Sequence, residues 1–581
     1  MPPVARDRLL RVNLTERTVT SEPVPQRWRR KYLGGKGLGA RYLYDELDPG
    51  TDPLGPDNVL LFVLGPASGY LPGEQRYAAI TKSPLTGAFL DSYAGGDFPL
   101  TLAGALENHI AILVTGRASE PIRLEVEAGT ARIEPTSTWG ADTVETDRSF
   151  PEASVACIGP AGERQVAYAT IASDEARHHA GRGGAGAVMG AKRLKAVVVR
   201  GDPPRPDGSI AALRERDLDR YADSHTGRWQ AASETLETVE FADTADVLAS
   251  HGWRERGFEG AEDVGVDAAR EAAVGRERDG DIPGGFRIET PEGETVPRGA
   301  TGMSLGAGLG ISDFDAVAAL GEQCNRLGVD LISAGNAVAW AIRASEAEIV
   351  DRDLAFGEPE EAGTLLEEIA HRSSALGAVL ADGVEDAADQ YGGRDLVPVV
   401  KRMSLPSYDP SGVASMALAY ATSDRGACHR RARPVERAVF EESWGPERAA
   451  AAIAAAQDIR SVRWSLVADD FTGESLDVAN WLDAVGAPTE DLENAGERIW
   501  NLVRLFNVRE GFDRNDDALP TGFTSNQGFD ADRFDRMLDA YYDRRGWDRS
   551  GKPSQETLAR LDLHDIQDGV TPPTFEADTE E

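Results

Sequence analysis

The most informative segment of the chain reads HHAGRGGAGAVMGAKRLKAVVV (residues 178–199). Four of its glycines, at positions 181, 183, 184 and 186, let the backbone turn tightly and point successive N–H groups at an anion. Arg182 adds a guanidinium in the same turn, and an apolar strand follows. The segment is neither a P-loop, because no GK[ST] occurs, nor a Rossmann fingerprint, because the loop precedes the strand. It predicts either a phosphate cradle or a crowded glycine turn packed on a sheet.

The residues around this loop are rich in short β-type runs separated by Gly, Pro and Asp. Their alternation is incomplete, so we expect several strands to be buried on both faces. A Pro- and Gly-rich segment, GDPPRPDGS (201–209), then marks a domain boundary. The runs are NVLLFVLG (58–65), RYAAITK (76–82), IAILVTG (110–116), IRLEVEAG (122–129) and KAVVVRG (195–201).

Helical periodicity dominates after this boundary, for example in DFDAVAALGEQCNRLGVD (313–330). The stretch 254–300 is acidic, Gly-rich and poor in apolar residues, so we expect a surface insertion or mobile loop there. The sequence therefore predicts an α+β fold, with an N-terminal β-sheet domain followed by two α-helical domains. The predicted domains are residues 1–208, 209–400 and 401–581.

Charge and composition exclude several classes of protein. The 581 residues include 98 Asp and Glu against 61 Lys and Arg, a formal net charge of −37. Nucleic acids and anionic membranes need clustered cations, so we expect neither as a partner, and the spread of acidic residues favours adaptation to concentrated salt over ordinary acidity. No apolar run reaches the ~20 residues of a membrane span, so we expect a cytoplasmic protein. Three cysteines exclude a disulfide scaffold and a four-thiolate metal site built by this chain alone.

Two further segments have residues suited to an anionic ligand. SYAGGDF (92–98) is a second glycine-rich turn, for which an ordinary hairpin is the competing interpretation. ATSDRGACHRRARP (421–434) places four arginines beside His429, which we expect to be a general acid/base with an accessible pKa. The competing interpretation is that these arginines pair with surrounding carboxylates.

Seven segments, in order along nearly the whole chain, resemble those of the tungsten-containing aldehyde ferredoxin oxidoreductases. The resemblance implies that the β domain is the cofactor-binding domain, supporting a tungsten or molybdenum bis-molybdopterin that the two helical domains enclose. It also implies oxidation of small aldehydes to carboxylic acids, with electrons leaving through a 4Fe–4S cluster to ferredoxin. The segments are GGKGLGARYLYDEL (34–47), TKSPLTGAFLDSYAGGDF (81–98), ACIGPAGE (156–163), AGRGGAGAVMGAKRLKAVVVRG (180–201), CNRLGVDLISAGN (324–336), YATSDRGACHRR (420–431) and IWNLVRLFNVREGF (499–512).

The resemblance also implies which residues contact the cofactor. It assigns His429 as the catalytic residue and no residue of this chain as a metal ligand. Tyr93 and Trp464 stand where the family has a pterin-contacting Asn and Asp. The implied cofactor contacts are Arg76, Ser92, Tyr93, Gly95, Arg182, Gly183 and Gly184 in the β domain, Asn325, Val329 and Asp330 in the second domain, and Arg425 and Arg431 in the third.

The chain departs from the family pattern at the iron–sulfur cluster and at the proton relay. The family's C-x2-C-x3-C group is missing, since no cysteine lies between Cys157 and Cys324, and the fourth ligand position is Asp469. The family's catalytic glutamate falls at Ala300 or Thr301, and neither side chain can transfer a proton as a carboxylate does. We expect the three cysteines that remain to be buried packing residues.

These residues predict an aldehyde ferredoxin oxidoreductase-like enzyme whose usual iron–sulfur electron route is lost. Electrons would pass to ferredoxin, to another soluble acceptor or to a partner subunit, and a homodimer is a family expectation. A second interpretation is a catalytically inactive pterin-binding protein that serves as a carrier, a scaffold or a regulatory subunit. A third is that the fold persists without binding anything, which the retained arginines and glycines disfavour.

Overall fold

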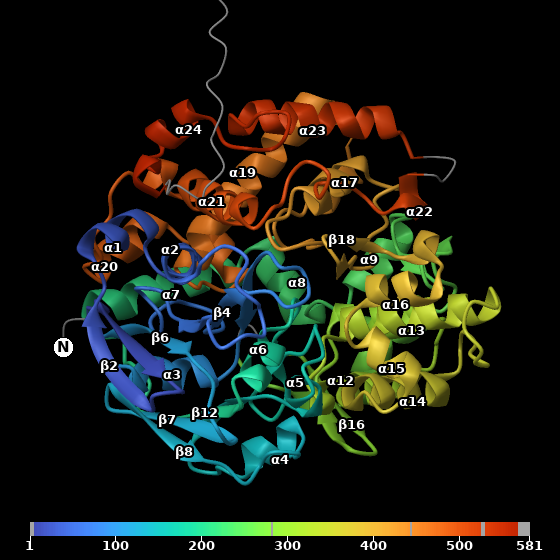
Figure 1. Cartoon of the computed structure of the whole chain (residues 1–581), viewed down its shortest axis with the longest axis horizontal. Coiled ribbons are helices and arrows are strands. Elements are labelled where there is room, and N and C mark those ends of the chain that lie inside the picture. The colour runs from blue at the N-terminus through green and yellow to red at the C-terminus, as the bar shows by residue number, and fades with distance from the viewer. Residues whose placement is uncertain (1–4, 281–282, 442–443, 525–528, 567–581) are drawn as a thin grey trace, which may run out of the picture.

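The computed structural model describes residues 5–280, 283–441, 444–524 and 529–566. Two six-stranded sheets fill the N-terminal part, drawn in blue and cyan in Figure 1. Their strand orders are β2-β1-β6-β3-β4-β5 and β11-β10-β9-β12-β7-β8. The strands are β1 (Arg8–Asn13), β2 (Thr18–Pro23), β3 (Leu60–Val63), β4 (Tyr77–Lys82), β5 (Phe89–Ala94), β6 (His109–Thr115), β7 (Ile122–Glu127), β8 (Thr130–Pro135), β9 (Ser154–Cys157), β10 (Ile171–Ser173), β11 (His178–Ala180) and β12 (Leu194–Arg200).

The first sheet is covered on both sides. One apolar core joins it to the second sheet, through residues such as Phe62, Ile112 and Val197. Another core joins its opposite face, at Leu61, to helices that include Ile499. Strands β3, β4 and β5 are buried at every position, which confirms the expectation of strands buried on both faces. The helices within or against this part are α1 (Gln26–Tyr32), α2 (Gly35–Glu46), α3 (Phe98–Ala105), α4 (Thr143–Arg148), α5 (Pro160–Glu163), α6 (Ala185–Ala191) and, from the C-terminal part, α21 (Leu492–Arg509).

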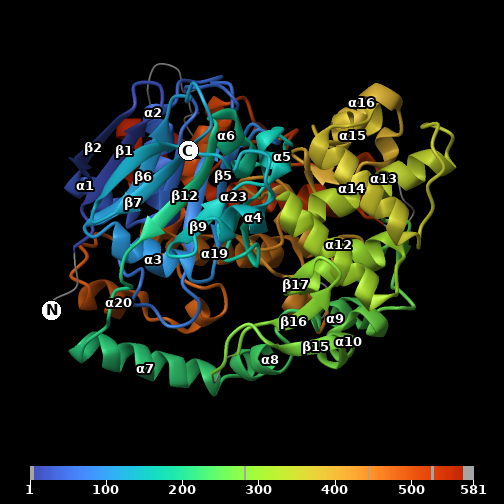
Figure 2. The ribbon, with the colours of Figure 1, turned by 90° about the horizontal axis from the view of Figure 1, so that it is seen from below.

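The rest of the described chain is mainly helical, and the predicted α+β class is confirmed. A large core runs through it from Leu305 and Trp340 to Met416 and Tyr541. Figure 2 shows α7 and α8 running along one side, from below the sheets to the helical part. The longer helices are α7 (Gly208–Ala222), α8 (His225–Ser233), α9 (Thr238–Thr244), α12 (Phe314–Leu327), α13 (Leu331–Glu346), α14 (Pro359–His371), α15 (Ala375–Leu380), α16 (Val384–Tyr391), α17 (Ala414–Ala421), α19 (Pro446–Ser465), α20 (Val478–Ala484), α23 (Ala531–Arg545) and α24 (Gln555–Arg560).

Of the two alternatives expected for 254–300, the mobile loop is wrong for the described residues of that stretch, and the surface insertion stays a prediction. These residues form regular elements, and Phe286 and Ile288 are buried against Phe314 of α12. Apolar residues are sparse in this stretch, but those on β16 alternate inward, which is sufficient to attach it to the core. The elements are β14 (Glu255–Arg256), which pairs with the preceding β13 (Ala249–Ser250), a 3-10 turn (Glu262–Val264), α10 (Val266–Ala272), β15 (Ala273–Arg276), β16 (Phe286–Thr290), β17 (Gly293–Thr295) and α11 (Gly299–Thr301).

The predicted domain boundaries fall at different kinds of places. The first coincides with the start of α7 at Gly208, and the second lies between the short strands β18 (Val399–Val400) and β19 (Met403–Ser404). Both boundaries stay predictions. Among the described residues, no single helix has the length and apolarity to cross a membrane. One pair of segments bent by 112°, Gly299–Leu309 and Phe314–Leu327, meets those criteria only when taken together.

Candidate functional site

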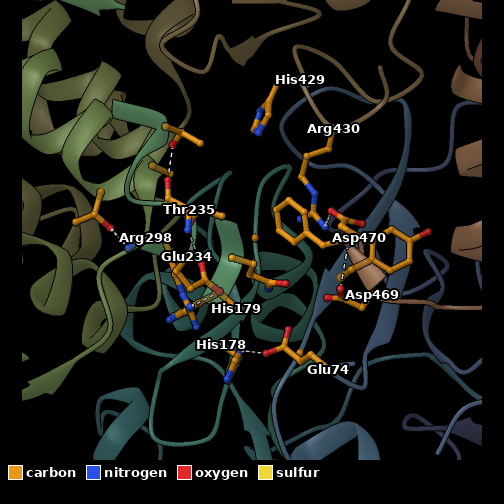
Figure 3. Close-up of a pocket in the computed structure, with 18 of the residues that line it drawn as sticks. Glu74, His178, His179, Glu234, Thr235, Arg298, His429, Arg430, Asp469 and Asp470 are labelled. Atoms are coloured by element: carbon orange, nitrogen blue, oxygen red, sulfur yellow. Dashed lines mark hydrogen bonds and ion pairs between the residues drawn. The ribbon is translucent and has the colours of Figure 1, made fainter. Parts of the chain in front are cut away.

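One large cavity lies where the sheets meet the helical parts of the chain. Its volume is about 1250 Å³. Figure 3 shows His429 at one end of it and His178 and Glu74 at the other. Ser92, Gly183 and Gly184 do not line it. The other predicted site residues do: Arg76, Tyr93, Gly95, Arg182, Asn325, Val329, Asp330, Arg425, His429 and Arg431.

The glycine-rich loop between β11 and α6 places Arg182 on the cavity wall. Gly183 and Gly184 adopt φ values of 80° and 86°, and a Cβ at position 184 would collide with the carbonyl oxygen of Ala167. The Ser92 hydroxyl donates to the carbonyl oxygens of Gly181 (2.7 Å) and Arg182 (3.1 Å). Ser92, Gly183 and Gly184 therefore determine the conformation of the loop without lining the cavity. A direct contact between these residues and a cofactor stays a prediction.

Four arginines on the cavity wall, Arg182, Arg214, Arg425 and Arg433, have buried donors without a hydrogen-bond partner. Arg182 and Arg425 are the two of them that the sequence predicted as site residues. Arg182 is 7% exposed; its Nη2 donates to the carbonyl oxygen of Ser404, while Nε and Nη1 make no hydrogen bond. The nearest acid to Arg182 is Asp330, with Oδ2 3.8 Å from Nε. Arg425 is 4% exposed and donates to the carbonyl oxygen of Asp91 (2.6 Å), but its Nε also has no partner. Unpaired buried donors of this kind fit an anionic ligand.

Arg431 differs, because it is neutralised inside the protein. It pairs with Asp91 and with Asp424 (2.7 Å), and Lys36 pairs with the same two carboxylates. All four side chains are buried. Lys36, Asp91 and Asp424 were not predicted as site residues. The only sequence signal for them was their position inside three of the segments that resemble the family.

The two departures Tyr93 and Trp464 pack against each other. Their rings are stacked with centroids 5.6 Å apart, and the Arg431 guanidinium lies 4.4 Å from the Trp464 ring. The Tyr93 hydroxyl donates to Asp91 (2.8 Å). An aromatic pair thus stands where the family has an Asn and an Asp. The pair packs against the buried ion cluster of Lys36, Asp91, Asp424 and Arg431.

His429 does not have the accessible pKa expected from the sequence. Burial, together with Arg433, Arg182, Arg430 and Arg425, holds the pKa of its imidazole well below the usual range. Its Nδ1 has no hydrogen-bond partner, and its ring lies 5.7 Å from that of Tyr408. An anion in the cavity would offset the arginines and raise this pKa.

Asn325, Val329 and Asp330 form the wall at the junction of α12 and α13. Asp330 caps α13 by accepting from the Ser333 amide (2.9 Å), and the Asn325 amide donates to Thr295 (3.3 Å). Ala300 and Thr301 also line the cavity, just before a π-helical turn (Gly302–Gly306). This wall therefore offers no carboxylate where the family's catalytic glutamate was expected.

A second group of paired charges, the Glu74 network, lines the cavity from His178 and Glu74 at one end to Arg430, near His429, at the other (Figure 3). Arg76 lies between Glu74 (3.0 Å) and Asp469 (3.1 Å), so the predicted fourth cluster-ligand position is already paired. Among the described residues, no group of three or more His, Cys, Asp or Glu could hold a metal ion. The remaining members are His178 with Glu277, Arg278 with Glu74, Arg298 with Glu234 and Glu277, and Arg430 and Arg433 with Asp470.

The three cysteines are buried, as expected, but they differ in character. Burial raises the pKa of the Cys157 and Cys324 thiols well above the usual range, which suits packing residues. Cys428 lines the cavity, and burial of its thiol is outweighed by Arg425, Arg431 and Arg182, which lower its pKa to about 6. Cys428 is therefore buried as expected, but it differs from the other two cysteines by lining the cavity, and its role stays a prediction.

Comparisons with known proteins cover nearly the whole chain. Residues 9–201 match the N-terminal domain of aldehyde ferredoxin oxidoreductase, and residues 213–563 match its domains 2 and 3. The chain is 31% identical to the tungsten-containing aldehyde ferredoxin oxidoreductase of Pyrococcus furiosus, over 96% of this chain and 98% of that protein. A second relative from the same organism, at 25% identity and 96% coverage of both chains, is the WOR-like subunit of an aliphatic sulfonate oxidoreductase.

A solved structure shares the fold. It is the active site complex BamBC of benzoyl coenzyme A reductase with 1,5-dienoyl-CoA, with a TM-score of 0.81 over 97% of this chain and 98% of that one. The sequence identity is 24%, so this likeness concerns the fold alone.

Proposed function

The chain belongs to the aldehyde ferredoxin oxidoreductase family, and from this premise we propose that it binds a tungsten or molybdenum bis-pterin and oxidises aldehydes to carboxylic acids. The observation that supports the proposal best is the set of unpaired donors on Arg182 and Arg425. Each arginine has one or more acceptors in the protein, but leaving a buried N–H without a partner costs about 1–3 kcal/mol, so an anion that accepts from these nitrogens would stabilise the site. The phosphates of a pterin cofactor are anions of this kind.

The residues of the cavity fit the pterin part of the cofactor. Arg182 and Arg425 would hold its phosphate oxygens, and Gly95, Asn325 and Asp330 would form the wall around it. When bound, the metal pterin accepts the two electrons that leave the aldehyde. Arg76 is held between two carboxylates, so its proposed contact with the cofactor competes with Glu74 and Asp469.

We assign the proton transfer to His429. Oxidation of an aldehyde to a carboxylic acid consumes one water and releases two protons, so a base is needed next to the substrate. The imidazole is neutral because of its surroundings, and its unpaired Nδ1 can accept a proton. An anionic cofactor would raise its pKa toward neutrality and strengthen it as a base.

The same cavity does not fit an iron–sulfur cluster. Asp469 is paired with Arg76 and also accepts from the Phe471 and Thr472 amides (3.0 and 2.9 Å), so it has no free carboxylate edge. We therefore propose that electrons leave to ferredoxin, another soluble acceptor or a partner subunit without a cluster in this chain. A cytoplasmic location and a homodimer belong to the same proposal.

Metal analysis of protein purified without oxygen tests the cofactor assignment. We expect about one tungsten or molybdenum and negligible iron for each chain. Absence of both tungsten and molybdenum together with pterin would refute the proposal. Four iron atoms for each chain would refute the inference that this chain lacks the cluster ligands, with Asp469 at the fourth ligand position.

An assay with aliphatic and aromatic aldehydes and an artificial dye as acceptor tests the activity. A second candidate function, an inactive pterin-binding carrier or regulatory subunit, is favoured by the lack of a carboxylate at Ala300 and Thr301. Full cofactor loading with no turnover of any aldehyde would establish that candidate instead. Turnover that is lost in His429→Ala with the metal content unchanged supports the enzyme.

A further inference from the structure

The proposed cofactor contacts account for only part of the cavity lining. They come from the ends of the sheet strands, from the junction of α12 and α13, and from the loop after α17. The lining on α7, α8 and α9 and at residues 440 and 471 has no role in the proposed function. The cavity volume of about 1250 Å³ also exceeds the about 300–1,000 Å³ of a typical pocket for one small ligand. The cavity therefore has room for a substrate beside the cofactor.

Four aromatic side chains line this unassigned part of the cavity in two contacting pairs. Trp229 of α8 and Phe471 have ring centroids 5.7 Å apart, and Phe241 of α9 and Phe440 have ring centroids 6.1 Å apart. None of the four side chains is fully buried, and Phe440 is 77% exposed. Apolar surface that stays open in a concave site marks a place for an apolar ligand, and aromatic side chains bind a further ring through offset or edge contacts. The two pairs therefore favour an aromatic ligand.

Arg214 of α7 adds a positive charge to the same part of the cavity. Arg214 and Leu218 both line it, and their spacing of four residues places them on one side of the helix. Among the described residues, Arg214 has no ion pair or hydrogen bond, and its Nε is buried without an acceptor. Arg433, which also has a buried Nε, differs because it pairs with Glu436 (3.2 Å). An unpaired guanidinium in a cavity fits an anionic group such as a carboxylate.

We propose that Arg214, Trp229, Phe241, Phe440 and Phe471 form a subsite, the aromatic–anion subsite, for an aromatic aldehyde that carries a carboxylate. The inference rests on the proposed function for the aldehyde group. The four rings hold the aromatic ring of the substrate by apolar contact, and Arg214 pairs with its carboxylate. An aromatic aldehyde without the acid group contacts the rings but leaves Arg214 unpaired, so Arg214 determines the specificity for the acid.

Isothermal titration calorimetry of the purified full-length protein tests the subsite without any turnover. Benzoate has both a ring and a carboxylate, benzamide is its neutral counterpart, and acetate lacks the ring. We expect benzoate to bind at least about ten-fold more tightly than benzamide or acetate, because it alone makes both kinds of contact. Equal affinities for benzoate and benzamide, or for benzoate and acetate, would overturn the inference.

Substitution of Arg214 locates the bound carboxylate. Arg214→Gln should remove the advantage of benzoate over benzamide. Arg216→Gln is the matched control on the same helix, because Arg216 is half-exposed, pairs with Asp217 (2.9 Å) and does not line the cavity. Benzoate affinity that is unchanged in Arg214→Gln, or that is lost in Arg182→Ala instead, would place benzoate at the cofactor wall and overturn the inference.

Phe440→Ala keeps the test decisive if Arg214→Gln fails to fold. The Phe440 ring is 77% exposed, so its removal leaves no cavity in the core. The affinities for benzoate and benzamide should both fall by at least about three-fold, and the affinity for acetate should stay the same. Unchanged affinities for the two aromatic probes would overturn the inference.

The dye assay separates this inference from the proposed function. 4-Carboxybenzaldehyde should have a kcat/KM at least about ten-fold above that of benzaldehyde, and Arg214→Gln should remove this difference. Oxidation of acetaldehyde and benzaldehyde with no preference for the carboxylated substrate would overturn the subsite and leave the proposed function standing. Benzoate binding that depends on Arg214, without oxidation of any aldehyde, supports the subsite and counts against the proposed function.

Discussion

Arg182 has two features that cost free energy in the unliganded protein. Its backbone has φ 67°, in a region that non-glycine residues adopt at a cost of about 1–3 kcal/mol. Two of its three guanidinium nitrogens are buried without a hydrogen bond. Such a residue is better explained by a ligand than by packing, because neither feature stabilises the fold.

Replacing Arg182 by Ala should therefore release the cofactor without unfolding the chain. Loss of one or two charge-assisted hydrogen bonds, each worth about 1.5–3 kcal/mol, predicts affinity at least about ten-fold weaker. Tungsten or molybdenum for each chain and the thermal unfolding midpoint are the two measurements. Arg132→Ala is the matched control, because Arg132 is exposed and pairs only at the surface. Full retention of metal and pterin would refute the role of Arg182.

His178 is the histidine of the Glu74 network, and it lies between two carboxylates. Its Nε2 lies 2.8 Å from Glu277 and its Nδ1 3.8 Å from Glu74. Burial opposes its charge, but the two carboxylates outweigh burial and raise the pKa of His178 above 6.5. Burial opposes the charge of both carboxylates, but Arg76 and then His178 lower the pKa of Glu74, and His178 and Arg298 lower that of Glu277.

The network should therefore stabilise the protein most between the ordinary pKa of a glutamate and that of a histidine, about pH 4.5–6.5. The His178 contribution is complete below 6.5 and is lost as pH rises through the higher folded pKa. The carboxylate contribution is lost as pH falls below about 4.5. His178→Gln should lower the free energy of unfolding by about 1–3 kcal/mol in this window and by less at pH 9.

Thermal unfolding of the variant and the wild type across pH 4–9 measures this difference. His564→Gln is the control, because His564 is 65% exposed and should show no such window. A difference between His178→Gln and the wild type that does not change with pH would contradict the charge assignment.

At the scale of the element, the loop between β11 and α6 depends on Gly184 for two separate reasons. Its φ of 86° disfavours any side chain, and a Cβ would also collide with Ala167. Gly184→Ala should destabilise the protein by about 2 kcal/mol or more. Gly50→Ala isolates the first reason, because Gly50 has φ 75° and a Cβ added there would have no other atom within 4 Å. Chemical denaturation measures the free energy of unfolding of both variants. An equal decrease in Gly184→Ala and Gly50→Ala would show that the close approach to Ala167 does not affect stability.

The sequence predicted those parts of the fold that depend on local pattern. Apolar runs bounded by Gly and Pro were sufficient to place the buried strands, and helical periodicity was sufficient for α12. The stretch 254–300 was misjudged because its overall composition is polar. The buried Phe286 and Ile288, which attach its hairpin to the core, are too few to change that composition. The collision that requires Gly184 involves Ala167, on another segment, and no local pattern reports it.

At the scale of the whole molecule, the site is assembled from distant segments. The cluster of Lys36, Asp91, Asp424 and Arg431 joins residues almost 400 positions apart. Charged residues are common along the chain, so their sequence positions did not distinguish these four from surface pairs. Family resemblance supplied Arg431, whereas the lysine and the two aspartates emerge only when the fold brings them together. The pKa of His429 was misjudged because no local pattern reports that its ring is buried in the fold, or that Arg182 from a distant segment joins the arginines of its own segment around it.

The net charge of −37 predicts that salt stabilises the folded chain. The Debye length falls from about 10 Å at 0.1 M to about 3 Å at 1 M, so repulsion among surface carboxylates is screened while buried pairs are little affected. The unfolding midpoint should rise by on the order of 2 °C from 0.1 to 2 M KCl, which corresponds to about 2 kcal/mol for a chain of this length. Sucrose at matched water activity controls for general exclusion of solutes from the surface. A charge-reduced variant should have a higher unfolding midpoint than the wild type at low salt, and its midpoint should rise less when KCl is added. An equal rise in the variant and the wild type would refute the repulsion argument. Its changes to Gln are at six glutamates that are exposed on the surface of the folded chain: Glu16, Glu120, Glu152, Glu259, Glu271 and Glu493.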